Sequence, residues 1–419
     1  MTERPLIRPR FLRGSLIALL ILLPFVAHSF WDYVEARRLT TALNAIQARG
    51  ETLVQQFHAP EGDAAQADRY YRAGAALASG FRPGPQGWFG RVIAAERAGE
   101  LPIDVADQLR SGVNDYREAL SFLDRAAPLP FAGIAPGYSY NYQWLSGVLR
   151  LAGLRALIRA IDGDSNGAVD SLYSEIRTAR VMQGPPLIPS AWMVSDVKRV
   201  VAASRPSAAS LERLGQALAE LDRDDSLTLH LQGLRAQFYQ GAPARNPIGP
   251  HSWPALLTRP WAMHELNGGL DAFSALLEAA EAPWPYRIDN IIAVGRWPVR
   301  VPSGSGLRRD DPKQAELFVL STVRQIVHLR SARIVVAIER YRRDHDEQMP
   351  ATLDALVPTY QPAPVIDPFT GQTILLKALA RGYAVYSVGS NRRDDGGDFH
   401  DVFLPTESPD TGIRIQWTP

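Results

Sequence analysis

Cysteine is absent from this chain of 419 residues, and its acidic and basic side chains almost cancel. Without cysteine the chain has no disulfide framework, zinc ribbon, cysteine nucleophile or iron–sulfur cluster. With 45 Lys and Arg against 44 Asp and Glu, the formal charge is +1, which predicts no basic face for nucleic acid. The hydrophobic share of 46% is that of a folded protein. At about 100–200 residues per domain, a chain of 419 residues is expected to form two or three domains.

Long apolar runs are equally scarce, and only one approaches the length of a membrane segment. Residues 15–31, SLIALLILLPFVAHSFW, form this run, which has 17 residues and is interrupted by Pro24 and His28. About 20 apolar residues span a typical bilayer. Four arginines precede the run and two follow it, at 37 and 38, which favours a cytoplasmic amino terminus. We therefore expect residues 1–31 to be a cytoplasmic basic flank and a single-pass anchor in the inner membrane.

The sequence leaves two possibilities open for this run, which are cleavage by signal peptidase and retention as an anchor. Ala27 and Ser29 fit the −3 and −1 positions of a signal-peptidase site, which would release the rest of the chain. Phe30 and Trp31 instead supply an interfacial aromatic belt, and the helical pattern continues as far as Ile46, which favours an uncleaved anchor. In both cases the bulk of the chain lies outside the cytoplasm, in the periplasm.

Residues 32–240 predict a helical domain, because apolar residues recur there at three- and four-residue spacing. The clearest element is an αα-hairpin with apolar stripes over residues 151–161 and 168–179, joined by Asp-Gly-Asp at 162–164. This hairpin resembles one unit of a tetratricopeptide array. No clear 34-residue recurrence appears elsewhere in the sequence, so a repeat solenoid stays an alternative to a helical domain without repeats.

Residues 241–312 are rich in proline and tryptophan and predict a connecting region. Proline removes backbone donors and fixes φ, so we expect ordered loops or extended segments, with one short helix at 264–282. The tryptophans predict either a stacking platform for a peptide or glycan or ordinary packing of loops onto a core. The residues concerned are Pro243, Pro247, Pro250, Pro254, Pro260, Pro283, Pro285, Pro298 and Pro302, with Trp253, Trp261, Trp284 and Trp297.

Residues 313–419 predict a long helix that ends before Pro350, followed by short strands at 373–376, 383–388 and 413–417. The expected fold class is therefore mainly α, with an amino-terminal membrane helix, a multi-helix domain and a small carboxyl-terminal α+β domain.

Three segments of this last domain resemble a known family: AIERYRRDHDEQMPATLDALVPTY at 337–360, DPFTG at 367–371 and GYAVYSVGSNRRDDGGDFHDV at 382–402. Over about residues 313–405 the chain resembles the carboxyl-terminal domain of the major pseudopilin of type II secretion systems. At the amino end it departs from that family, since Ala18 stands where a glutamate is typical. The matching residues are Tyr341, Asp344, Pro350, Leu353, Leu356, Asp367, Pro368, Phe369, Tyr386, Ser387, Gly389 and Asp401. As a whole, the chain resembles anchored bacterial envelope proteins that join a helical region to this module, a kinship that supplies no activity.

The acidic loop after 387 is the candidate metal site. Calcium takes six to eight oxygen ligands and tolerates irregular geometry, and the resemblance implies that this loop binds calcium. Against the family pattern, Asn391 takes a position usually held by aspartate. The alternative is a solvated Asp-Asp-Gly-Gly turn that Arg392 and Arg393 partly neutralise. The candidate ligands are Val388, Asn391, Asp394, Asp395, Asp398 and Asp401.

Catalytic motifs are not found. His264 and Glu265 begin a zincin-like string, but Gly268 stands where the second histidine is needed. We therefore expect a non-enzymatic interaction or structural protein of the cell envelope, with a protein partner and a link to type II secretion-like machinery. The alternative is a hydrolase of envelope glycan or peptide polymers with the Trp-rich region as its substrate surface, and it needs a carboxylate pair that spacing alone does not locate.

Overall fold

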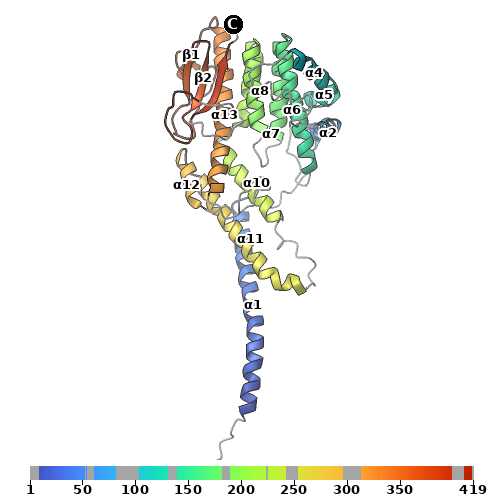
Figure 1. Cartoon of the computed structure of the whole chain (residues 1–419), viewed down its shortest axis with the longest axis vertical. Helices are drawn as coiled ribbons and strands as arrows, with labels where there is room; N and C mark the ends of the chain where they lie inside the picture. The colour runs from blue at the N-terminus through green and yellow to red at the C-terminus, as the bar shows by residue number, and fades with distance from the viewer. Residues whose placement is uncertain are drawn as a thin grey trace, which may run out of the picture. The chain divides into compact units, whose positions relative to one another are not determined.

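The computed structural model describes residues 9–51, 53, 61–81, 103–130, 139–181, 189–222, 225–241, 253–295, 313–398 and 410–417. Over these ranges the chain is mainly helical, with twelve α-helices and one small antiparallel sheet near the carboxyl end (Figure 1). The predicted class, mainly α with a small carboxyl-terminal sheet, is confirmed. By its internal contacts the chain divides into two compact units, each built from three separate stretches of sequence.

Unit 1 comprises Met1–Gln56, Leu231–Ala279 and Val294–Ala315. Its long helices are α1 (Pro9–Ala48) and α11 (Trp253–Ala280), and α10 (Ser226–Gly241) enters it with its second half. The helical pattern predicted through Ile46 is confirmed by α1. A small apolar cluster joins these helices through Ile46, Leu53, Leu266 and Leu270, with Phe238 packed against it.

The predicted anchor, residues 15–31, lies within α1. Side chains of this segment are described from Leu20 onward, apart from Ile21. In the part of the chain that the structure describes, no helix combines the length and the apolar character needed to cross a membrane.

Unit 2 comprises Phe57–His230, Ala280–Ala293 and Glu316–Pro419. The predicted hairpin is present as α6 (Ser139–Ile161) and α7 (Ser165–Val181). Its turn depends on Gly163, whose φ of +84° favours glycine, and on Asp164, which accepts a hydrogen bond from the Gly167 N–H at 2.9 Å at the start of α7. The other helices before residue 230 are α2 (Gly62–Leu77), α4 (Ile103–Asn114), α5 (Arg117–Ala126), α8 (Pro189–Ala203) and α9 (Ala208–Leu221).

The carboxyl-terminal part of unit 2 is a long helix against a sheet. Helix α13 (Lys313–Asp344) confirms the predicted helix, and a short 3-10 turn, η2 (Leu353–Leu356), follows it. Strands β1 (Leu375–Leu379), β2 (Gly382–Ser387) and β3 (Thr411–Gln416) form the sheet in that order, so the predicted strands are displaced by at most three residues. Every residue of the central strand β2 is buried, and the strand shares one apolar core with α6, α7, α8, α9 and α13.

Two helices correct the prediction for residues 241–312. Helix α11 begins at Trp253 rather than at 264, and α12 (Tyr286–Val294) was predicted as loop. Pro254 is in the first turn of α11, where its missing N–H costs no helical hydrogen bond. Pro260 lies inside the helix and is buried. The apolar residues that α11 buries outweigh the cost of one proline, a balance that counting prolines does not reveal.

Candidate functional site

Four of the residues that carry the pseudopilin resemblance, Asp367, Phe369, Ser387 and Gly389, meet around the carboxylate of Asp367. Its Oδ1 accepts hydrogen bonds from the Phe369 N–H and the Ser387 hydroxyl, both at 2.8 Å. The same Ser387 oxygen accepts a bond from the Gly389 N–H at 3.0 Å. Burial raises the pKa of Asp367, and the bonds from Phe369 and Ser387 partly oppose that shift. These contacts tie the 367–371 turn to the end of β2 and fix where the acidic loop begins.

Hydrogen bonds occupy one carboxylate oxygen of each of two loop aspartates, Asp394 and Asp395. Asp394 Oδ1 accepts bonds from the Tyr386 hydroxyl at 3.1 Å and from the Gly396 N–H at 2.8 Å. Asp395 Oδ2 accepts a bond from the Asn391 amide at 2.7 Å. These two oxygens therefore act as acceptors for donors in the loop and in β2.

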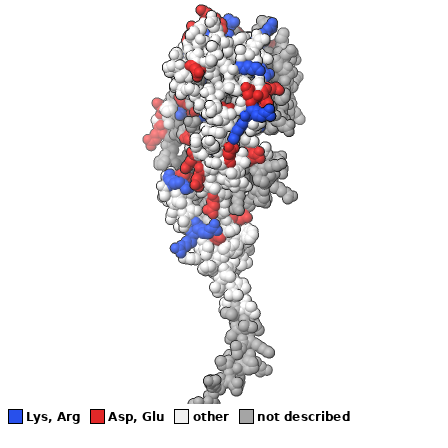
Figure 2. Space-filling view, turned by 90° about the vertical axis from the view of Figure 1, so that its left-hand side faces the viewer, with Lys and Arg blue, Asp and Glu red and all other residues white. Residues whose placement is uncertain are grey.

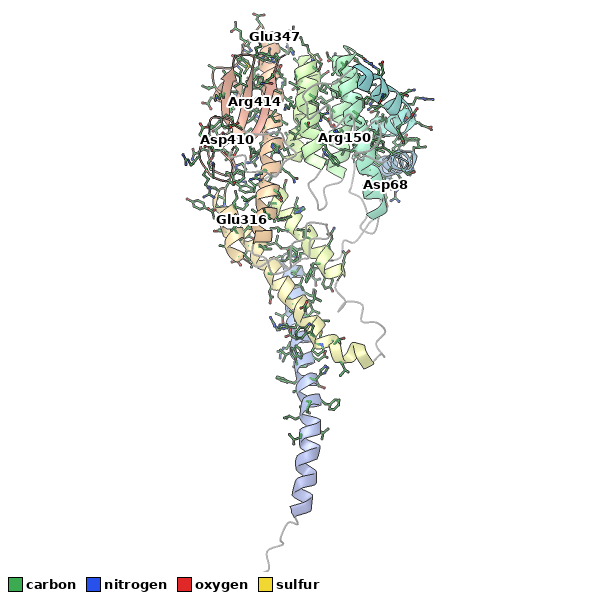
Figure 3. All side chains as sticks on the ribbon, in the orientation of Figure 1. Asp68, Arg150, Glu316, Glu347, Asp410 and Arg414 are labelled. Carbon is green, nitrogen blue, oxygen red and sulfur yellow. The ribbon has the colours of Figure 1, made fainter. Side chains whose placement is uncertain are left out.

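A residue that the sequence did not single out, Asp410, closes the loop from the far side. It is fully buried and accepts bonds from the Gly397 N–H at 2.7 Å and the Asp395 N–H at 3.4 Å. Burial raises its pKa, and these two bonds partly oppose the shift. Arg414 donates to the Gly397 carbonyl at 2.8 Å, and the Lys377 ammonium donates to the Gly396 carbonyl. Figure 3 labels Asp410 and Arg414 beside the sheet. Asp410 lies beside the loop because it directly precedes β3, whose first residue, Thr411, pairs with Ser387 at the end of β2. The spacing of these residues in the sequence does not show this relationship.

The six predicted calcium ligands are thus only partly brought together. Val388 is buried at the end of β2, Asp398 is exposed, and Asp401 lies outside the described residues. Among the residues that are described, no group of three or more His, Asp or Glu side chains is arranged to hold a metal ion. Two loop carbonyls, of Gly396 and Gly397, accept hydrogen bonds from Lys377 and Arg414, and calcium binding stays a prediction.

A second candidate is a pair of carboxylates buried between α6, α7 and α8. Asp196 pairs with Arg150 at 3.0 Å and with Arg199 at 3.2 Å. Glu175 is fully buried, and neither of its carboxylate oxygens has a hydrogen-bond partner among the described atoms. Burial raises the pKa of Glu175 well above its usual range, and the charge of Asp196 adds to the shift, while Arg150 opposes it. The buried site therefore favours the protonated, neutral form of Glu175.

Gly153 on α6 makes room for this pair. A Cβ added at that position would lie 2.1 Å from Asp196 Oδ2 and 3.1 Å from Glu175 Oε1. No side chain larger than glycine fits there without displacing a carboxylate. Arg150, labelled in Figure 3, covers the other side of Asp196 and lies 5.9 Å from the Trp192 ring centroid. Neither carboxylate of the pair is exposed to solvent.

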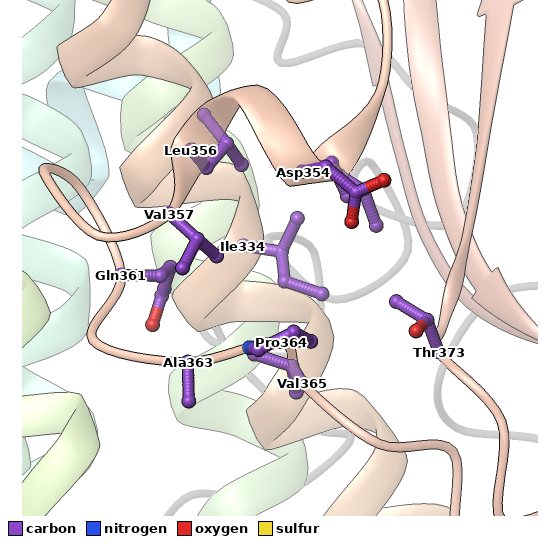
Figure 4. A pocket seen from close by; sticks show the side chains of 10 residues that line it. Ile334, Asp354, Leu356, Val357, Gln361, Ala363, Pro364, Val365 and Thr373 are labelled. Carbon is purple, nitrogen blue, oxygen red and sulfur yellow. The ribbon is translucent and has the colours of Figure 1, made fainter.

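One small pocket lies between α13, η2 and the segment that leads to Thr373 (Figure 4). Apolar side chains such as Ile334, Leu356 and Val365 form most of its lining, and Asp354 contributes the one carboxylate. Its free space is about that of a single water molecule. It does not bring two carboxylates together around a substrate.

A third polar centre surrounds Glu35 of α1, within unit 1. The buried carboxylate of Glu35 accepts hydrogen bonds from Asn267 Nδ2 at 2.8 Å and Trp31 Nε1 at 3.3 Å, and it contacts His264 Nδ1 at 2.9 Å. Burial raises the pKa of Glu35, but the hydrogen bonds from Asn267, His264 and Trp31 outweigh it, so the pKa is lowered overall. His264, which opened the zincin-like string, thus contacts a glutamate on another helix.

Glu35 was missed at the sequence level because two of its partners, His264 and Asn267, lie more than 220 residues away in the chain. The only local signal is a glutamate one turn after Trp31, on the helix face that otherwise carries apolar residues. Comparison of the chain with models of protein families, with curated proteins and with solved structures finds no match.

Proposed function

We propose that this protein is a membrane-anchored, extracytoplasmic interaction or structural protein, with α1 as its anchor. The observation that carries the proposal is the exposure of large apolar side chains on every side of α1 before Trp31. Leu20, Leu22, Leu23, Phe25 and Val26 are between 58% and 63% exposed. Successive helical residues are about 100° apart, so these five surround the helix. A helix that is apolar all round matches a lipid environment rather than water.

The orientation follows from the flanking charges. Arginines at 4, 8, 10 and 13 precede the apolar run, and Arg37 and Arg38 follow it. Cations accumulate on the cytoplasmic side of membrane segments, which supports a cytoplasmic amino terminus and a periplasmic location for the rest. The aromatic residues Phe30, Trp31 and Tyr33 then lie at the outer interface, which supports an anchor that is retained.

An interaction role is supported by how the candidate chemical groups are used. Asp196 is buried and paired with two arginines, Glu175 is buried beside it, and the described pocket holds about one water. Figure 2 shows acidic and basic side chains interspersed over the face in view, as suits a protein partner rather than nucleic acid. The Asp367–Ser387 contact links motif residues of the pseudopilin resemblance, and on that basis we propose a partner within type II secretion-like machinery.

Reporter fusions test the anchor and its orientation. Alkaline phosphatase joined after Thr40 should be active, since that enzyme folds only outside the cytoplasm, whereas a fusion after Gly14 should be inactive. β-Galactosidase at the same two positions should give the reverse pattern. Strong β-galactosidase activity at Thr40 would overturn the orientation, and a soluble chain after carbonate washing of membranes would overturn the anchor.

The alternative, a hydrolase of envelope polymers, is tested with the purified full chain and peptidoglycan as the probe. No soluble product is expected. Product release that is lost in both Glu175→Gln and Asp196→Asn, but kept in Glu316→Gln, would replace the interaction role with catalysis by the buried pair.

A further inference from the structure

Helices α1 and α11 run in the same direction, and their contacts keep a nearly constant offset along the chain. His28 Nε2 bonds the Leu257 carbonyl at 3.0 Å, and Trp31 meets Trp261 edge to face with ring centroids 6.3 Å apart. Farther along, Glu35 meets Asn267. Each contact joins residues 229 to 232 positions apart. The amino-terminal ends of α11 and α1 therefore point the same way, toward the membrane in which α1 is proposed to be anchored.

Two large apolar side chains project from this end of α11. Leu257 is 61% exposed and Trp261 is 62% exposed, although Pro260 and Met263 beside them are buried. They lie level with His28 and Trp31, where the apolar run of α1 ends. In Figure 1 the first turns of α11 diverge from α1 rather than following it closely. The exposed side chains of Leu257 and Trp261 are therefore accessible at the level expected for the membrane surface.

The charges at this level are already paired. Arg259, which lies between Leu257 and Trp261, forms an ion pair with Asp32 of α1 at 2.7 Å. Paired charge lowers the cost of bringing this part of α11 close to an apolar phase. Farther from the apolar run the polar contacts continue, with Arg38 paired to Asp271 at 3.1 Å. Among the described residues of α11, the exposed large apolar side chains are therefore found at its amino-terminal end.

We propose that the amino-terminal turns of α11, through Leu257 and Trp261, bind the outer interface of the lipid bilayer beside α1. The proposal rests on the anchor proposed above and adds a second contact with lipid. Tryptophan favours the headgroup level, where its ring is apolar and its N–H stays hydrated. Helices that lie in the interface bury an apolar face about 5–10 Å into the headgroup and acyl boundary. Together with Phe30, Trp31 and Tyr33, these residues make a belt carried by two helices rather than one.

The absence of native cysteine allows a direct depth measurement on the full chain. Single cysteines are placed at Leu257→Cys and Trp261→Cys, labelled with an environment-sensitive fluorophore, and reconstituted in phosphatidylethanolamine–phosphatidylglycerol vesicles. Lipids with a quencher near the headgroup should reduce the fluorescence at both positions by about twofold, as expected for groups within the interface. Glu278→Cys, on the same helix and about 30 Å farther along its axis, is the matched control and should not be quenched.

Phe25→Cys on α1, measured with a second quencher carried deep in the acyl chains, separates the two proposals, because position 25 lies near the middle of the apolar run. Strong quenching at position 25 without quenching at 257 and 261 would overturn the lipid contact of α11 and leave the anchor intact. Absence of quenching at all three positions would overturn both. Leu257→Cys keeps the test valid if Trp261→Cys disturbs the contact with Trp31, because the Leu257 contact to α1 uses its backbone carbonyl. If the labels at 257 and 261 are instead shielded from the quencher increasingly as the protein concentration rises, the surface binds a second copy of the chain rather than lipid.

Discussion

The phenol of Tyr383 donates a hydrogen bond of 2.9 Å to Oε1 of Glu339, and both groups are buried. Arg342 holds the same carboxylate at 2.8 Å and stacks over the Trp417 ring at 4.2 Å. Burial raises the pKa of Tyr383 well above its ordinary value, and the charge of Glu339 adds to the shift, so the phenol stays a donor at all physiological pH values. This contact fastens the central strand β2 to helix α13.

Replacing Tyr383 with phenylalanine should therefore destabilise unit 2. The variant keeps the ring but leaves a buried charged acceptor short of one donor, which costs about 1–3 kcal/mol. Urea denaturation of Tyr383→Phe is expected to show a lower midpoint with an unchanged slope. Tyr286→Phe, at an exposed tyrosine of α12, is the control and should match the parent. Equal midpoints for the two variants would show that the bond contributes nothing.

Replacing Glu175 with glutamine should stabilise the fold increasingly as the pH rises. The folded pKa of Glu175 is raised above the ordinary value of 4.5. Its contribution is fully present below the unfolded pKa and is lost as pH rises through the folded pKa. Over that window the parent loses about 1.4 kcal/mol per pH unit from this group, whereas glutamine has no proton to lose. Denaturation from about pH 5 to pH 8 measures the difference, with Glu316→Gln as control. A difference that is independent of pH would contradict the protonated state.

Gly153→Ala should be clearly destabilising although alanine is the better helix former. The added Cβ would overlap Asp196 Oδ2, and overpacking of this kind costs about 1–3 kcal/mol. The matched control is Gly215→Ala in α9, where the new Cβ meets Val336 at an ordinary 3.5 Å. That control should be neutral or more stable by up to about 1 kcal/mol. Similar effects at both glycines would mean that the carboxylate pair relaxes easily.

Calcium binding at the acidic loop stays a prediction from sequence and depends on Asp401. An ion that binds only the folded state raises the thermal midpoint by mass action, so millimolar calcium should raise it and a chelator should lower it. Asp398→Asn and Asp401→Asn should abolish the shift, whereas Asp346→Asn, outside the loop, should keep it. If a calorimetric titration with calcium shows no heat and a chelator does not change the thermal midpoint, the loop is closed by Asp410, Lys377 and Arg414 without an ion.

Much of the helical fold was predictable because its signals are local. The hairpin of α6 and α7 is encoded by two apolar stripes and by the Asp-Gly-Asp turn, where only Gly163 needs a positive φ. Strand β2 was predictable because Tyr383, Val385 and Tyr386 are residue types that favour strands. The start of α11 was not, because Pro254 and Pro260 indicate a break unless the buried face of the helix is known.

The candidate sites were less predictable because they depend on partners distant in sequence. The acidic loop was visible as a cluster of aspartates, but Asp410, which closes it, joins only through the pairing of β2 with β3. Glu175 and Asp196 lie 21 positions apart on different helices, and nothing in their spacing indicates that Gly153 admits both. The sequence shows which polar groups are present, whereas the packing of the folded chain determines which of them are buried away from water.

The hydrogen-bond partners of Glu35 have a consequence for the order of events during synthesis. Asn267 follows Glu35 by 232 residues. At about 5–20 residues per second, roughly 10–50 s pass between the appearance of α1 and that of α11 on a translating ribosome. During that interval His264 and Asn267 are not yet present to bind Glu35, and the proposed anchor in α1 can enter the bilayer before α11 packs against it. Completion of unit 1 is thus expected to be a late step of biogenesis, and a chain that stops before Asn267 would carry the proposed anchor without this contact.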